Sequence, residues 1–120
     1  IARMGRLKLE QDSRETVLRD KNPLTAKDIF DGAKAGDEVS AELVEELGEM
    51  LGTALSYIGC VTNPEIFVIG GGVSKAGEIV TDTIRKYFQK YAFHAAAQTP
   101  FALAQLGNDA GIYGSVKMVL

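Results

Sequence analysis

The residues best suited to chemistry in this sequence are three consecutive glycines at the start of Gly70–Ser74. They follow the apolar run Ile66–Ile69 and precede a helical pattern, which predicts a turn from a buried strand into a helix. At such a turn, backbone N–H groups lie at the positive end of a helix dipole with no side chains in the way, which suits a phosphate or a nucleotide. The alternative is a tight connection that needs positive φ, although one glycine usually suffices for that.

The common phosphate-loop fingerprints do not match this turn. Gly72 and Gly77 have the Walker A spacing, but Glu78 and Ile79 follow where Lys and Ser or Thr are required. The dinucleotide fingerprint also fails, because Lys75 stands where a third glycine or alanine is needed. The sequence therefore predicts a ligand-facing turn without assigning it to either class.

A second glycine-flanked helix start, Gly107–Gly111, also follows a predicted strand and is explained by an N-cap. Asp109 is a poor general base there, because the helix N-terminus stabilises its charged form. His94 has no Cys, Asp or Glu at ligand spacing, and Cys60 is expected to be a small buried hydrophobe. No catalytic or metal-binding residue is predicted.

The elements that position these residues follow from periodicity and from turn signals. Thr25 with Asp28 and then Asp37 are the expected caps of two helices, Gly36 ends the first, and Asn63 with Pro64 ends the second. The expected helices cover residues 2–18, 26–35, 38–62, 75–91 and 110–120, and the expected strands cover residues 66–69 and 99–104. The first strand is expected to be buried on both faces, and the aromatic residues Tyr87, Phe88 and Tyr91 are expected in the core.

The long helix 38–62 carries a stripe of small residues at Gly48, Gly52, Ser56 and Cys60. Glycine costs about 1 kcal/mol inside a helix, so the stripe needs a packing reason. We expect close packing on a neighbouring helix or sheet, with a wall for a flat ligand as the alternative.

Composition excludes several classes of function. The 13 Lys and Arg against 16 Asp and Glu argue against nucleic acid or an anionic membrane as the main partner. A single cysteine excludes an internal disulfide, and no apolar run reaches the roughly 18 residues of a membrane span. We therefore expect a cytoplasmic α/β protein. Because the chain starts at Ile1 rather than Met, and two strands make a poor sheet, we expect the remaining strands to come from upstream sequence or from a second copy.

Two segments together resemble the C-terminal part of bacterial ROK-family sugar kinases, with the glucokinases of Gram-positive bacteria most similar. They are Asn63–Ser74, which reads NPEIFVIGGGVS, and Leu106–Ser115, which reads LGNDAGIYGS. The resemblance extends over essentially the whole chain, including Thr25–Phe30 and Ala33–Asp37.

The resemblance implies the actin-like ATPase (ribonuclease H-like) fold, in which ATP and sugar bind between two α/β domains. Residues 1–120 would then be a partial C-terminal domain, helix-rich with about two strands. It implies ATP and Mg²⁺ as cofactors, a hexose as substrate and a homodimer. It also places four residues beside the adenosine and phosphates of ATP: Gly70, Gly71, Gly72 and Ser74.

The family's phosphate loop, catalytic Asp, sugar ligands and multi-cysteine zinc motif all precede this region, so a structural Zn²⁺ would have its ligands outside this chain. The resemblance therefore implies that the chain alone is inactive, because phosphoryl transfer depends on positioning and charge stabilisation. Two alternatives stay open. Some ROK members are sugar-responsive transcriptional repressors, and the long and last helices could form a non-catalytic dimerisation module.

Overall fold

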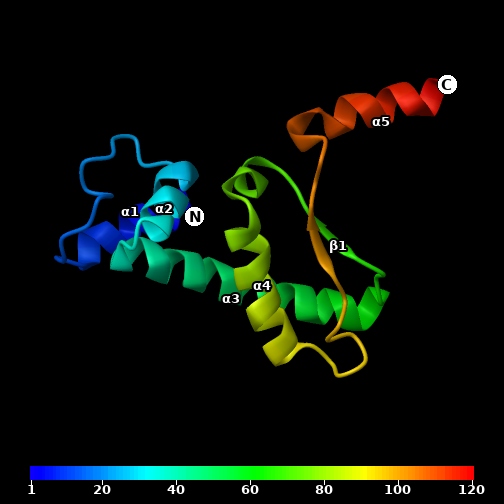
Figure 1. Cartoon of the computed structure of the whole chain (residues 1–120), viewed down its shortest axis with the longest axis horizontal. Coiled ribbons are helices and arrows are strands. Elements are labelled where there is room, and N and C mark those ends of the chain that lie inside the picture. The colour runs from blue at the N-terminus through cyan, green and yellow to red at the C-terminus, as the bar shows by residue number, and fades with distance from the viewer.

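The computed structural model describes residues 1–120 apart from the side chain of Asn108, and this range holds five α-helices and two short parallel strands (Figure 1). The order is α1 (Ala2–Gln11), α2 (Ala26–Lys34), α3 (Glu38–Thr62), β1 (Phe67–Ile69), the 3₁₀ turn η1 (Gly72–Ala76), α4 (Glu78–Tyr91), β2 (Phe101–Leu103), the 3₁₀ turn η2 (Gly107–Asp109) and α5 (Ala110–Val119). The expectation of a helix-rich α/β chain with about two strands is confirmed.

The starts of α2 and α3 follow the predicted caps. Thr25 accepts a hydrogen bond from the Asp28 N–H, and the Asp28 carboxylate accepts one from the Thr25 N–H, which completes a capping box. Between the helices Gly36 has φ +90°, a conformation that favours glycine. Asp37 then caps α3 by accepting from the Ser40 N–H at 2.8 Å. Local chemistry therefore fixes both helix starts.

Asp37 also anchors the preceding loop. Its carboxylate accepts hydrogen bonds from the Thr16 hydroxyl at 2.8 Å and from the Val17 N–H at 3.2 Å. Burial by itself raises the pKa of Asp37, but the hydrogen bonds from Ser40, Thr16 and Val17 outweigh it and hold that pKa below the ordinary value.

The first helix is shorter than expected, because α1 ends at Gln11 and not near Leu18. Arg14 stabilises the turn after the helix. Its guanidinium donates to the Asp12 carboxylate, and its two terminal nitrogens donate to the Glu42 carboxylate at 2.8 and 2.7 Å. Hydrogen bonds from Arg14 hold the pKa of Asp12 and that of Glu42 at about 2. Arg19 donates to the backbone carbonyl oxygen of Asp12, which closes the loop after the helix. These contacts reach across the fold, so helical periodicity alone could not locate the end of α1.

The stripe of small residues on α3 is where α4 crosses it, so the expectation of close packing is confirmed. A Cβ at Gly52 would lie 2.7 Å from the Phe88 backbone nitrogen and 2.8 Å from the Ile84 carbonyl oxygen, and one at Gly48 would collide with Thr83. The alternative of a wall for a flat ligand is wrong. The prediction of a buried Cys60 is also wrong, because the thiol is exposed and the stripe ends instead at Gly59.

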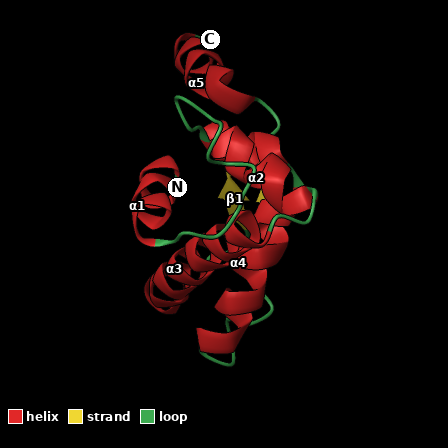
Figure 2. Cartoon of the chain, turned by 90° about the vertical axis from the view of Figure 1, so that its left-hand side faces the viewer, coloured by secondary structure: helices red, strands yellow, loops and turns green.

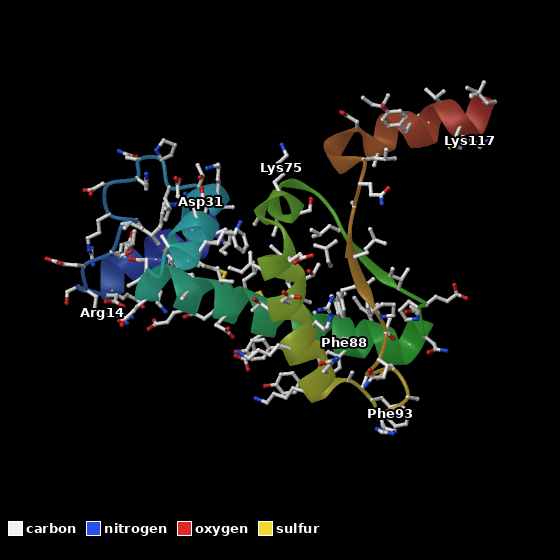
Figure 3. The ribbon with its side chains drawn as sticks, in the orientation of Figure 1. Arg14, Asp31, Lys75, Phe88, Phe93 and Lys117 are labelled. Atoms are coloured by element: carbon white, nitrogen blue, oxygen red, sulfur yellow. The ribbon has the colours of Figure 1, made fainter. Side chains whose placement is uncertain are left out.

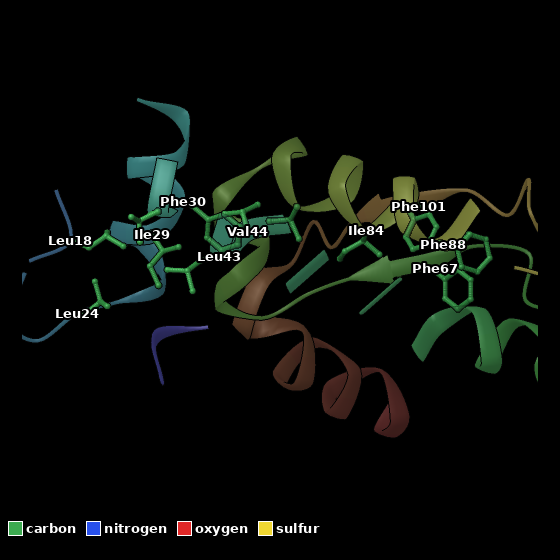
Figure 4. Close-up of a cluster of buried hydrophobic side chains, with 12 residues drawn as sticks. Leu18, Leu24, Ile29, Phe30, Leu43, Val44, Phe67, Ile84, Phe88 and Phe101 are labelled. Atoms are coloured by element: carbon green, nitrogen blue, oxygen red, sulfur yellow. The ribbon is translucent and has the colours of Figure 1, made fainter. Parts of the chain in front are cut away.

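The strands pair in parallel with Phe67 opposite Phe101, and both rings pack on Phe88 of α4 (Figure 4). Centroid separations are 5.1 to 5.4 Å, a distance at which aromatic pairs are favourable. The expectation that β1 is buried on both faces is wrong: Val68, on the opposite face, is 60% exposed, because no described element covers that side. The Tyr91 side chain is also exposed, so of the three aromatic residues expected in the core only Phe88 is fully buried there.

A second part of the core lies where α2 meets the start of α3, and Figure 4 shows it continuous with the phenylalanine cluster. Its fully or nearly buried side chains are Leu18, Leu24, Ile29, Phe30, Val39, Leu43 and Val44.

The molecule is extended, and α5 stands apart from the other α-helices in both views (Figures 1 and 2). The radius of gyration is 16.3 Å, whereas about 14 Å is normal for this length. The accessible surface of 7857 Å² exceeds by about 1,500 Å² the roughly 6,300 Å² of a compact protein of 12.9 kDa. The predicted apolar side of α5, including Ile112, Tyr113 and Val116, is solvent-exposed. The molecule therefore exposes more surface than a compact protein of its mass, by an amount typical of a protein–protein interface.

Within the described residues, no helix has both the length and the apolar character needed to cross a membrane.

Candidate functional site

The glycine turn leaves β1 at its carboxyl end, as predicted. Gly70 lies against Ala104, because a Cβ built on it would be 3.4 Å from the Ala104 Cβ. Gly71 has φ +75° and ψ −166°, a conformation essentially restricted to glycine. Gly72 has no positive φ, and a Cβ there would meet no atom within 4 Å. The backbone conformation therefore requires glycine at position 71. At position 72 the conformation does not require glycine, and the space that a Cβ would occupy is open.

The turn does not enter the long helix directly, which corrects the expected helix 75–91. It enters the five-residue turn η1, and Gly77, with φ +86°, separates η1 from α4. This positive φ does not fit a right-handed helix, so the helix cannot run through it. The N–H groups of Gly70–Gly72 consequently do not lie at the N-terminus of α4, and the helix-dipole argument does not apply to them.

Ser74 stabilises the turn through its own hydroxyl. The Oγ donates to the Gly71 carbonyl oxygen at 2.7 Å, and the Ser74 N–H reaches the same oxygen at 3.3 Å. The hydroxyl hydrogen is used inside the turn, which leaves the oxygen lone pairs as acceptors.

The second glycine motif lies beside the first. The strands are parallel, so η1 and η2 both follow carboxyl ends at the same edge of the sheet, and the two turns are in contact. This is the edge at which open α/β sheets bind ligands. The expected cap is only partly present: Asp109 precedes α5 but its side chain makes no capping hydrogen bond. The Asn108 side chain lies outside the described residues.

A cavity of about 180 Å³ lies between α2 and η1 and reaches the glycine turn at Gly72. Drug-sized ligands occupy roughly 300–1,000 Å³, so the cavity suits one flat ring system and not a whole nucleotide. Its lining is mostly apolar. The lining residues are Ala26, Lys27, Phe30, Asp31, Gly72, Lys75 and Ala76.

The rim of the cavity is charged, and Asp31 on α2 lies across from Lys75 on η1 (Figure 3). Lys27 pairs with Asp31 at 2.5 Å, and the hydrogen bond with that carboxylate raises the pKa of Lys27. Lys34, one turn further along α2, donates to the Ala76 carbonyl oxygen at 2.5 Å. Two lysines and one aspartate line the cavity, so its net positive charge favours an anion.

Sequence reasoning predicted the glycine side of this cavity and missed the α2 side. Phe30 and Asp31 are about 40 residues from the glycines, and no local pattern connects the two segments. The capping box at Thr25 was the available signal, because it fixes where α2 starts and hence which residues share a face. His94 is exposed and does not line this cavity. In the part of the chain that is described, no cluster of His, Cys, Asp or Glu is arranged to hold a metal ion.

Known proteins resemble this chain over most of its length. The model of the ROK family matches residues 8–120. A glucokinase of Halalkalibacterium halodurans is 44% identical over 97 residues, which are 80% of this chain and 29% of the relative. A ROK family glucokinase from Streptomyces griseus, solved with glucose and AMPPNP, aligns with a TM-score of 0.72 at 32% identity, over 81% of this chain and 32% of that one.

A solved ROK family transcriptional regulator has the same fold over this region, with a TM-score of 0.74 and 22% identity over 85% of this chain and 26% of the regulator. The chain spans about 30% of the length of the curated relatives that it matches.

Proposed function

Because this chain belongs to the ROK family, we propose that it forms one side of the nucleotide site of an ATP-dependent glucokinase, in its C-terminal domain. The observation that carries the proposal is the largely apolar cavity of about 180 Å³ that opens onto Gly72, at the carboxyl ends of two parallel strands. The glucokinase resolved with AMPPNP has the same fold over this region, which supports ATP as the ligand. The reaction is transfer of the γ-phosphoryl group to the 6-hydroxyl of glucose.

In this proposal the adenine base enters the cavity and the phosphates follow the glycine turn. Phe30 and Ala76 provide apolar surface for a ring, and the absent side chain at Gly72 leaves the entrance open. Lys75 and Lys27 at the rim favour the negative phosphates. Gly70, Gly71 and Ser74 support the turn that brings Gly72 to the cavity.

The described residues bind and orient the nucleotide but carry no base for the sugar hydroxyl. Asp31 is paired with Lys27, and Asp109 is exposed at the start of α5. We therefore assign the base and the sugar ligands to the rest of the whole protein. Mg²⁺ normally neutralises charge on the transferred phosphoryl group, but the described residues hold no group of three or more His, Cys, Asp or Glu placed for a metal ion, so we derive no step through a metal.

The open surface supports the idea that the chain works packed against more protein. About 1,500 Å² of excess surface lies within the range of standard protein interfaces. We propose that further strands of the sheet cover Val68, and that the α5 face packs against the remainder of the enzyme or a second copy in a homodimer. A sugar-responsive regulator is the second candidate, because the solved regulator has this fold.

Titration with AMPPNP, followed by amide chemical shifts, tests the proposal. A Gly72→Leu variant fills the cavity entrance and should weaken binding at least tenfold, or about 1.4 kcal/mol. The unfolding midpoint should not change, because nothing lies within 4 Å of the new Cβ. Gly111→Leu is the matched control. A Cβ at Gly111 also meets open space, but Gly111 is on α5 and does not line the cavity. Equal AMPPNP affinity in all three proteins would refute the cavity as the base site, and absence of binding would favour the regulator.

A further inference from the structure

The turn η1 is bounded on both sides by glycines with the same unusual backbone. Gly71 has φ +75° and ψ −166°, and Gly77 has φ +86° and ψ −156°. This region is essentially restricted to glycine, whose missing Cβ also makes rotation out of it easy. The segment between them is therefore a short unit with a flexible joint at each end.

Hydrogen bonds inside η1 keep its shape but do not fix its position. Ser74 bonds the Gly71 carbonyl oxygen, and the Gly77 N–H donates to the Ser74 carbonyl oxygen at 3.1 Å. Both bonds lie inside the turn, so neither joins it to α2. Among the hydrogen bonds of the described residues, the one that joins η1 to α2 is that from Lys34 Nζ to the Ala76 carbonyl oxygen, 2.5 Å long.

Lys34 lies where it can set the width of the cavity. Helix positions 27, 30, 31 and 34 share one face of α2, and the first three line the cavity. Lys34 does not line the cavity itself, but it holds Ala76, which does. The hydrogen bond from Lys34 to Ala76 therefore limits the distance between η1 and Phe30.

We infer that Lys34 is a positioning residue, which holds η1 against α2 and thereby sets the width of the slot for the base. The nucleotide in this inference is that of the proposed function. The contact between Lys34 and η1 does not depend on that function. Loss of the ammonium group leaves η1 held by the packing of Val73 and Ala76 against the core, so the turn moves more easily about Gly71 and Gly77, the slot widens and the amides of the turn open more often. The nucleotide must then order the turn when it binds, and affinity falls.

Three variants of the full chain separate this role from a general structural one. Lys34→Met keeps most of the stem and removes the donor, Lys34→Arg restores a donor, and Lys117→Met removes a lysine from α5, far from the cavity (Figure 3). Hydrogen exchange at Ser74 and Gly77 is measured without nucleotide, and affinity is measured with AMPPNP.

We expect Lys34→Met to accelerate exchange at Ser74 and Gly77 by about three- to tenfold and to weaken AMPPNP binding by a similar factor, as loss of an ordinary, solvent-exposed hydrogen bond predicts. Lys34→Arg should restore both readouts, and Lys117→Met should change neither. Exchange unchanged in Lys34→Met, or AMPPNP affinity equal to that of the unsubstituted chain, overturns the inference. Failure of the unsubstituted chain to bind AMPPNP overturns the proposed function instead, while the exchange rates still decide whether Lys34 holds the turn.

Discussion

Gly52→Ala is a sharp test of how α3 and α4 pack, because two opposing effects act at this position. Alanine stabilises a helix interior by about 1 kcal/mol relative to glycine. However, the new Cβ would lie 2.7 Å from the Phe88 nitrogen and 2.8 Å from the Ile84 carbonyl oxygen. Both are backbone atoms, so they cannot move aside as a side chain can, and the helices must separate.

The magnitude follows from the balance of these effects. Overpacking in a filled core costs typically 1–3 kcal/mol, and contacts this short belong to the upper half of that range. After the gain in helix propensity, we expect Gly52→Ala to lower the free energy of unfolding by about 1–2 kcal/mol. Gly59→Ala on the same helix is the matched control: its Cβ would make an ordinary 3.5 Å contact with the Phe88 ring, so the variant should be neutral or more stable.

Urea unfolding followed by circular dichroism measures the difference. With a slope of about 2 kcal/mol per molar, the middle of the usual range, the Gly52→Ala midpoint should fall by about 0.5–1 M while the slope stays constant. If Gly52→Ala unfolds at the same urea concentration as the unsubstituted chain or a higher one, the close approach of the two helices is refuted.

Three further outcomes can be checked separately. Phe88→Ala should cost about 3–5 kcal/mol of unfolding free energy, because Phe88 is completely buried, whereas Phe93→Ala, at a 67% exposed position, should stay within about 0.5 kcal/mol in the same urea assay. Asp37→Ala removes a helix cap and should cost about 0.5–2 kcal/mol at pH 7. Because the folded pKa of Asp37 lies below the unfolded value of 3.8, this stabilisation is present above pH 3.8 and is lost as the pH falls through the folded value, so thermal melts of variant and parent should converge in acid. In the AMPPNP titration, amides of residues 70–76 and 26–31 should shift, and shifts confined to other segments would contradict the site.

Local signals were sufficient for α3, whose bounds the sequence predicted at both ends. Asp37 caps the first turn, and Asn63 takes a left-handed conformation with φ 44° just before Pro64. The end of α1 was not predictable, since Arg14 determines it by reaching Glu42 on another helix. The periodicity of α4 likewise ran through Gly77, because nothing local distinguishes a glycine inside a helix from one that interrupts it.

The candidate site also has one part that the sequence predicts and one part that it does not. The strand, the glycine turn and the second glycine motif follow from residue order, and parallel pairing then brings the two turns together. The α2 side of the cavity depends on a tertiary contact, so only its shape in three dimensions identifies Phe30 and Lys34. The exposure of Val68 was also beyond prediction, because an apolar run looks the same whether or not a neighbour covers it.

The pairing of Phe67 with Phe101 also bears on which contact of the native state opens first. Residues 52 and 88 on α3 and α4 are 36 apart in sequence and the paired residues 67 and 101 are 34 apart, so loop length does not distinguish the two contacts. Each strand is only three residues long and Val68 is exposed, whereas Gly52 and Phe88 are in close backbone contact, so we expect the sheet to open before the two helices separate. Native-state hydrogen exchange should then protect the centre of α3 longest and release Phe67 and Ala104 earlier. The glycine turn lies at the end of β1, so a ligand bound at the turn would oppose the opening of the sheet.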